Sequence, residues 1–262
     1  QWGIEHAPNI DINSAANISV IKGAGALKYS GSAIGGIVIA EPPKVFLKDS
    51  LYGKTVITGG TNGRGGSVST RLTRSFENGW FTSLQGTYKR FGDFETPEYV
   101  LSNSGLIDQS ASFQFGLNKV NYGFEFFIST VNNDIGIIRA SHLHAASDQL
   151  RAIKSNQPWY IEPFTYKINP PFQEVKHNIA KFKIFKRFQD FGKLTFQYHF
   201  QDNKRLEFDV RRGQYKNIPA TNLRLKTHTI MLDFDSEFLN MFDFNYGIKG
   251  CLLYTSPSPR DK

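Results

Sequence analysis

Apolar and polar residues alternate along most of the chain. In one stretch, Trp80, Leu84 and Tyr88 would lie on one face of a strand. Ser83 and Gln85 would lie on the opposite face, because successive side chains of a strand point to opposite sides of the sheet. The same alternation recurs in the segments 112–118, 193–201 and 242–249. The pattern predicts antiparallel strands that have one apolar face and one polar face.

The alternating segments predict nine strands joined by connections of two lengths. The expected strands are 52–60, 65–76, 80–91, 107–117, 123–131, 174–187, 193–201, 222–234 and 242–250. Short turns at 77–79, 119–122 and 189–192 alternate with long loops at 92–106, 132–173 and 202–222. Short connections on one rim and long connections on the other are typical of an outer-membrane barrel. A soluble β-sandwich would also alternate, so the connection lengths favour the barrel.

The spacing of two aromatic residues bears on the height of the apolar face. Trp80 and Tyr88 lie eight residues apart, which corresponds to roughly 26 Å along a strand. This spacing approaches the height of the apolar band between two aromatic girdles, although ordinary cross-strand packing is the alternative.

In the segment 222–234, the polar residues Arg224, Lys226 and His228 share a face with apolar residues. A β-bulge near Thr227 would account for this departure.

The first 43 residues differ in composition from the rest. Glycines are concentrated between residues 23 and 36, and Pro42-Pro43 closes the segment. Two adjacent prolines continue neither a helix nor a central strand, which predicts a domain boundary near Lys44. The glycines do not form a nucleotide-binding motif. The dinucleotide fingerprint requires a third glycine where Lys28 stands, and no Gly-Lys-Ser/Thr sequence follows Gly31 or Gly36, as a Walker loop would require.

Composition and charge narrow the class of protein. Aromatic residues make up 14% of the chain, which favours strands. No apolar run is long enough for a membrane-spanning helix, and a mean hydropathy of −0.36 is uninformative, since alternating strands average to low values. The net charge of +8 is dispersed along the sequence, which argues against nucleic acid as a partner. The single Cys251 excludes a disulfide framework and a cysteine-based zinc site within the chain.

The glycine-rich segment 18–39 resembles the last conserved stretch of the plug domain in TonB-dependent outer-membrane receptors. The positions that carry the resemblance are Lys22, Gly23, Tyr29, Ala33, Gly35 and Gly36. Ser30 departs from the family pattern, which usually has glycine at this place. Weaker resemblances are found at 1–3 and 6–11 (the stretch before the motif), 59–66 (the first barrel hairpin) and 134–140 (the opening of a large extracellular loop). The alternative is a glycine-rich hairpin in a soluble β-protein.

The resemblance implies an all-β fold, a partial transmembrane antiparallel up-and-down β-barrel. It implies the C-terminal part of a plug domain at 1–43 and the N-terminal portion of the barrel at 44–250. Barrels of this family have about 22 strands around a plugged lumen, so nine strands predict a fragment. The expected missing parts are the signal peptide, the TonB-contacting segment, the first half of the plug and the remaining strands. The tail 251–262 resembles translated sequencing-adapter DNA and is expected to be non-native, with a genuine Pro-Ser loop as the alternative.

The function implied by the resemblance is TonB-dependent active uptake of a scarce ligand, such as a ferric siderophore or a similar metal chelate. The expected location is the outer membrane of a Gram-negative bacterium. The expected partners are the inner-membrane TonB complex, outer-membrane lipid and the small-molecule cargo. We expect neither a cofactor nor an enzymatic activity, because the sequence shows no pairing of a nucleophile with a base. The alternatives are a passive porin, an adhesin or translocator barrel, and a soluble carbohydrate-binding β-sandwich.

Two long loops contain cationic and aromatic residues that would suit an anionic chelate. The candidate ligand-facing residues are Arg139, His142, His144, Arg205, Arg211, Arg212 and Tyr215. The alternative is that these loops are polar simply because they are solvated. His142 and His144 lack a third ligand nearby, so we predict no metal site.

Overall fold

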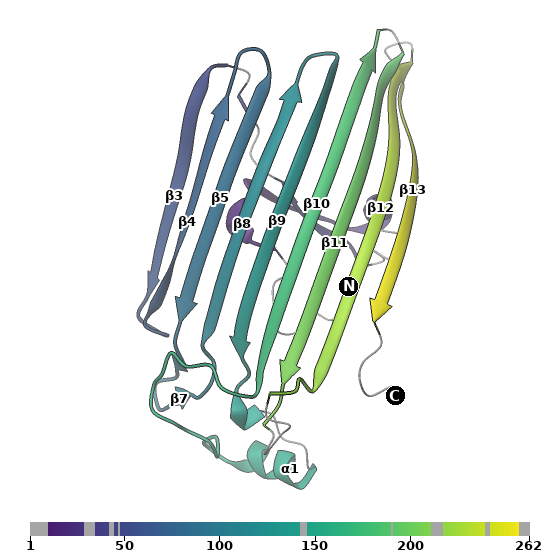
Figure 1. Cartoon of the computed structure of the whole chain (residues 1–262). Coiled ribbons are helices and arrows are strands. Elements are labelled where there is room, and N and C mark those ends of the chain that lie inside the picture. The colour runs from purple at the N-terminus through teal and green to yellow at the C-terminus, as the bar shows by residue number, and fades with distance from the viewer. Residues whose placement is uncertain are drawn as a thin grey trace.

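The computed structural model describes residues 10–28, 35–41, 45–46, 48–141, 146–189, 191–210, 217–238 and 242–256. One curved antiparallel sheet dominates the fold (Figure 1). Its strands are β3 (Ser50–Gly60), β4 (Gly65–Ser75), β5 (Trp80–Phe91), β8 (Leu106–Asn118), β9 (Tyr122–Gly136), β10 (Phe172–Phe188), β11 (Gly192–Phe208), β12 (Thr221–Phe238) and β13 (Phe242–Ser256). Each of these nine strands pairs with its neighbour in chain order. The predicted all-β class and the up-and-down order of nine strands are confirmed.

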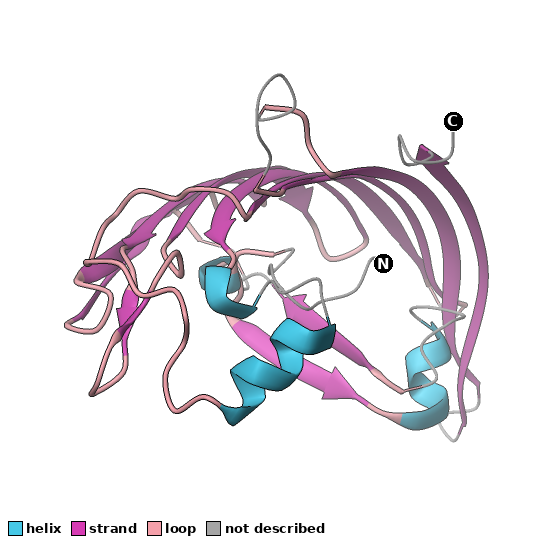
Figure 2. Ribbon diagram, turned by 90° about the horizontal axis from the view of Figure 1, so that it is seen from below, coloured by secondary structure: helices cyan, strands magenta, loops and turns pink. Residues whose placement is uncertain are grey.

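The smaller elements lie inside the curve of the sheet or in its long loops. The N-terminal unit, residues 10–41, contains η1 (Ile12–Ser14), β1 (Asn17–Ile21), η2 (Gly23–Lys28) and β2 (Ile37–Glu41). β1 pairs with β2, and this two-stranded sheet lies on the concave side of the large one (Figure 2). The long loops contain β6 (Phe94–Glu95), β7 (Val100–Leu101), η3 (Arg139–Ser141) and α1 (Ala146–Lys154). No helix among the described residues is long and apolar enough to cross a membrane.

The two faces of the large sheet have opposite polarity, as the alternation predicts. On the convex face, Ile57 and Ile248 are each 78% exposed, and Leu84 is 59% exposed. On the concave face, the polar residues Gln85 and Thr87 are buried. A soluble sandwich places its apolar residues between two layers, whereas this sheet turns them outward, as a lipid-facing barrel wall does.

One cluster of aromatic residues on the convex face lies near the short turns. The ring of Trp80 on β5 lies 5.2 Å from that of Phe115 on β8 and 5.6 Å from that of Phe124 on β9. Trp80 therefore does pack across strands, and it keeps 36% of its surface exposed. Tyr88 lies at the long-loop end of the same strand and is also exposed. Trp80 and Tyr88 lie at opposite ends of the apolar stretch of β5, which are the positions of the aromatic girdles in outer-membrane barrels.

The later strands are longer than the sequence pattern indicates. β11 continues seven residues past its predicted end at Gln201, because backbone pairing with β10 and β12 does not require apolar side chains. Its 17 residues span roughly 56 Å, about twice the height of an apolar band. The strands thus extend well beyond that band at the long-loop end.

Because the strands extend beyond the apolar band, the polar residues of β12 need no β-bulge near Thr227, and the predicted bulge is wrong. The register between β11 and β12 is continuous there, with Gln201 opposite Thr227 and Asp202 opposite Lys226. The polar residues on the convex face of β12 belong to the part of the strand beyond the apolar band. β13 likewise continues without a break through Cys251 to Ser256, paired with β12. That the tail 251–262 is non-native stays a prediction.

Candidate functional site

Asp11 joins the N-terminal unit to the concave wall of the sheet. One oxygen of its carboxylate, Oδ2, accepts hydrogen bonds from Gln85 Nε2 at 3.0 Å, Thr87 Oγ1 at 2.7 Å and Ser110 Oγ at 2.7 Å. The other oxygen accepts from the backbone N–H of Asn13 at 2.9 Å and so caps η1. Four hydrogen bonds thus satisfy a carboxylate that is only 9% exposed.

Arg71 on β4 holds the same unit from the side of the wall. Its Nη2 donates to the backbone carbonyl of Asn13 at 3.0 Å and to that of Ser14 at 2.6 Å. The same nitrogen donates to Oε1 of Gln85 at 3.1 Å. Gln85 therefore links Arg71 to Asp11, and we call these three residues the latch. The two hydrogen bonds among these three residues join positions that are 14 and 74 residues apart in the sequence.

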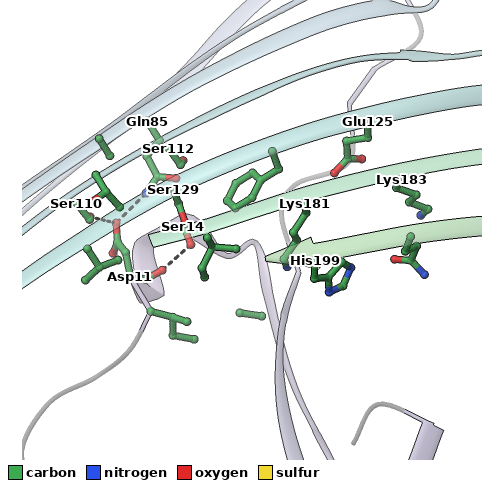
Figure 3. A pocket seen from close by; sticks show the side chains of 18 residues that line it. Asp11, Ser14, Gln85, Ser110, Ser112, Glu125, Ser129, Lys181, Lys183 and His199 are labelled. Atoms are coloured by element: carbon green, nitrogen blue, oxygen red, sulfur yellow. Dashed lines mark hydrogen bonds between the residues drawn. The ribbon is translucent and has the colours of Figure 1, made fainter. Parts of the chain in front are cut away.

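A cavity of about 280 Å³ lies between the N-terminal unit and the wall, next to the latch. The unit contributes Ile10, Asp11, Ser14 and Ala40, and the wall contributes residues of β5 and of β8 to β11. Lys181, Lys183 and His199 lie on the side of the cavity away from Asp11, and Glu125 is beside them (Figure 3). The lining combines these charged groups with hydroxyls of Ser110, Ser112 and Ser129. Apolar side chains, among them Ile10, Phe127 and Ile179, complete the lining.

The glycine motif sits at the ends of β1 and β2. Gly23 and Gly36 have φ values of 73° and 112°, a region that favours glycine. A Cβ at Gly36 would lie 2.7 Å from the carbonyl oxygen of Ile21, whereas one at Gly35 would meet nothing within 4 Å. Lys22 follows β1 directly. Tyr29 and Ala33 lie outside the described residues.

Buried polar side chains tie the long loops together. Asn103 Nδ2 donates to the carbonyl oxygens of Ile137, Asn169 and Pro171 at 2.9, 2.8 and 2.7 Å. In the same region, the carboxylate of Asp93, which is 1% exposed, accepts from the backbone N–H groups of Ser104 and Thr165. The loop 92–105 is thereby fixed to the loop 137–171.

Arg139 lies in this loop assembly, as the sequence predicts. Its guanidinium lies 3.9 Å from the centre of the Tyr160 ring and donates a hydrogen bond to the Tyr160 hydroxyl. That hydroxyl donates in turn to Glu162, and this bond is the main cause that raises the pKa of Tyr160. The three residues help to line a second cavity of about 190 Å³. Arg139 therefore borders this cavity and already has Tyr160 as a partner.

The other candidate ligand-facing residues have different positions. Arg205 is not in a loop, which corrects its predicted placement: it lies in β11, 8% exposed, on the concave side. The cause is the extension of β11 beyond Gln201. The remaining candidates, His142, His144, Arg211, Arg212 and Tyr215, lie outside the described residues. Among the residues that are described, no group of three or more His, Cys, Asp or Glu side chains is arranged to hold a metal ion.

The sheet and its faces define a partial antiparallel β-barrel with an apolar outer wall. No protein-family model matches the sequence. No curated protein is detectably similar to it either. Among solved structures, the fold is similar to that of the siderophore receptor PiuA from Acinetobacter baumannii, with a TM-score of 0.59 and 15% sequence identity. The match covers 91% of this chain and 35% of the receptor chain, so this chain spans about a third of the length of the protein that it resembles.

Proposed function

We propose that the chain is part of a TonB-dependent receptor that takes up a scarce ligand, such as a ferric siderophore, across the outer membrane of a Gram-negative bacterium. The observation that carries the proposal is the latch, which seats the N-terminal unit against the polar concave wall of a barrel sheet. In this account residues 1–43 are the end of a plug and residues 44–250 are the first part of the barrel. The fold of PiuA, a siderophore receptor, supports the proposal.

The nature of the latch favours energy-coupled transport over passive diffusion. A unit inside the lumen obstructs the path that a porin would keep open. The contacts of Asp11 and Arg71 are hydrogen bonds to charged groups, and each contributes only about 1.5–3 kcal/mol net, because water replaces the partner when the bond breaks. A pull on the unit would therefore release it bond by bond. The inner-membrane TonB complex is the proposed source of that pull.

The positive charges in the cavity and in the outer loops favour an anionic cargo. Lys181 and Lys183 face the cavity behind the N-terminal unit, and Arg139 lies in the loops at the outer rim. A cationic lining raises the local concentration of an anionic solute. A ferric siderophore with net negative charge fits these surroundings.

Uptake measurements test the proposal. The full-length protein would be expressed in an outer-membrane host that lacks its own ferric-siderophore receptors, and radioactive iron would be supplied as chelates. We expect uptake that stops when tonB is deleted or when the proton gradient is collapsed. Uptake that persists without TonB, together with steady ion conductance in planar bilayers, would establish the passive barrel instead. A protein that stays soluble without detergent would favour the carbohydrate-binding sandwich.

A further inference from the structure

A pocket of about 290 Å³ lies among the long loops, and we call it the rim pocket. It is lined by Tyr99, Ala152, Gln157 and Trp159, among others. These residues come from the loop before β7, from the end of α1 and from the turn that follows α1. α1 and β7 both lie beyond the long-loop end of the sheet (Figure 1). The rim pocket is therefore a different site from the cavity between the N-terminal unit and the wall.

The rim pocket differs in charge from the smaller cavity beside it. Trp159 lines the rim pocket and Tyr160 lines the smaller cavity, and residues 138–140 alternate between the two in the same way. The smaller cavity is lined by charged side chains, among them Arg139 and Glu162. None of the described residues that line the rim pocket carries a charge. Its lining therefore favours a neutral solute.

Two aromatic side chains give the rim pocket flat apolar surfaces. Trp159 is exposed, and the guanidinium of Arg151 lies 4.7 Å from the centre of its ring. This cation–π contact holds the ring against α1. Tyr99 belongs to another loop, and its backbone N–H and carbonyl oxygen are both hydrogen-bonded to Thr96. Both aromatic residues are thus positioned by contacts with the protein itself.

A polar turn lies next to these two aromatic residues. The N–H of Ser155 donates to the carbonyl oxygen of Ala152 at 3.2 Å, and Pro158 prevents the helix from continuing. Between them, the Ser155 hydroxyl donates to the carbonyl oxygen of Gln157 at 2.6 Å and accepts from the N–H of Gln157 at 3.4 Å. Among the described residues, the side-chain amide of Gln157 has no hydrogen-bond partner. This amide offers donors and an acceptor to a solute.

We propose that the rim pocket binds a neutral sugar through one hexose-sized ring. The weakly positive C–H groups on one face of such a ring pack against the negative face of an aromatic ring, here that of Trp159 or Tyr99. The sugar hydroxyls both donate to and accept from the amide of Gln157. Pockets for drug-sized ligands measure about 300–1,000 Å³, so a pocket of about 290 Å³ suits one ring and not a whole metal chelate.

Saturation-transfer NMR of the full-length protein tests the proposal, in a polyoxyethylene detergent whose head group contains no sugar. The probes are the methyl glycosides of glucose, galactose, mannose and N-acetylglucosamine at millimolar concentration. We expect transfer to at least one of them, strongest to the C–H protons of one ring face. Trp159→Ala should abolish this transfer, and Trp159→Phe should retain part of it. The matched control is Ile161→Ala, since Ile161 is 42% exposed and Trp159 43%, but Ile161 is not in the lining. The control should keep the transfer.

Two further comparisons define the ligand. The methyl glycoside of glucuronic acid, which adds a carboxylate, should bind no more tightly than that of glucose. A soluble polysaccharide and a ferric chelate, each containing the sugar that binds, separate two sources of the sugar. Retention of the polysaccharide supports a glycan of the cell surface as the ligand, and retention of the chelate supports a sugar attached to the cargo. The second result would rest on the proposed function.

The inference is overturned if none of the four neutral glycosides receives transfer, or if the transfer is unchanged in Trp159→Ala. Tighter binding of the glucuronic acid glycoside would overturn it too, because the pocket would then be an anion site, as would retention of neither larger ligand. Heat-dependent migration in gel electrophoresis checks that each variant is folded. Should Trp159→Ala not fold, Gln157→Ala in the exposed turn should weaken binding severalfold. The glycoside measurements contain neither cargo nor TonB, so their failure is distinct from a failure of the uptake proposal.

Discussion

The side-chain amide of Gln85 donates a hydrogen bond to the carboxylate of Asp11, 3.0 Å away, across 74 residues of sequence. Gln85 also accepts from Arg71, so one wall residue serves both charged members of the latch. Asp11 and Arg71 are connected indirectly, because both are hydrogen-bonded to Gln85 and to the start of η1. This arrangement makes the seating of the N-terminal unit depend on a few identifiable atoms.

Asp11→Asn should loosen the N-terminal unit. An asparagine retains one acceptor oxygen, but its NH2 group would face the groups that donate hydrogen bonds to Asp11. The mismatch should weaken the binding of the N-terminal unit to the wall by about 1–3 kcal/mol. The measurement is the conductance of the full-length protein in planar bilayers, where we expect more frequent openings. Asp49→Asn, at an exposed aspartate before β3, is the control. Equal conductance of the Asp11 variant and the unchanged protein would contradict the role of the latch.

Gly36→Ala should destabilise the N-terminal unit, whereas Gly35→Ala should be tolerated. Gly36 has a φ of 112° and no room for a Cβ beside the Ile21 carbonyl, while the space at Gly35 is open. The expected cost at Gly36 is about 1–3 kcal/mol. Limited proteolysis of the folded full-length protein checks this by the rate of cleavage within residues 10–41. Equal rates for the two variants would show that the backbone of Gly36 is not constrained.

Asn103→Ala should release the long loops from one another. The substitution leaves three carbonyl oxygens without their shared donor, and it places alanine at a φ of 65°. A loss of about 2–4 kcal/mol of local stability is expected. Hydrogen exchange of residues 137–171 should become faster, with no change in the strands. Asn156→Ala, an exposed asparagine of the same loop, serves as the control and should leave exchange unchanged.

The double variant Lys181→Gln, Lys183→Gln should slow the uptake of an anionic ferric chelate by about tenfold, because the cavity loses its two positive charges. Uptake of a neutral chelate should change little. Lys186→Gln removes a charge from the convex face of the same strand and should have no effect on either cargo. If both chelates are slowed equally, the lysines act on the structure of the barrel and not on the charge of the cargo.

The order and faces of the strands were predictable because they depend on a local pattern. Trp80, Leu84 and Tyr88 mark the convex face of β5 from their spacing alone. The ends of the strands were not predictable in the same way. Arg205 was expected in a loop and lies in β11, because backbone hydrogen bonds continue after the apolar residues stop.

The latch was not predictable from the sequence at all. Asp11 lies within a segment that resembles the receptor family, but nothing in the sequence pairs it with Ser110, which is 99 residues away. Serine, threonine and glutamine on the concave face follow from alternation, and their partners follow only from the curvature of the sheet. The glycine motif is an intermediate case, since the need for glycine at Gly36 could be expected from the resemblance but its cause is a contact with Ile21.

The most direct test of the receptor assignment is the genomic sequence that flanks this reading frame, translated on both sides. We expect a signal peptide and the rest of a plug domain before residue 1. After residue 250 we expect about 13 further alternating strands in place of the tail. A reading frame whose start codon lies directly before Gln1 and whose stop codon follows Lys262 would contradict the assignment, because nine strands do not close a barrel of this kind.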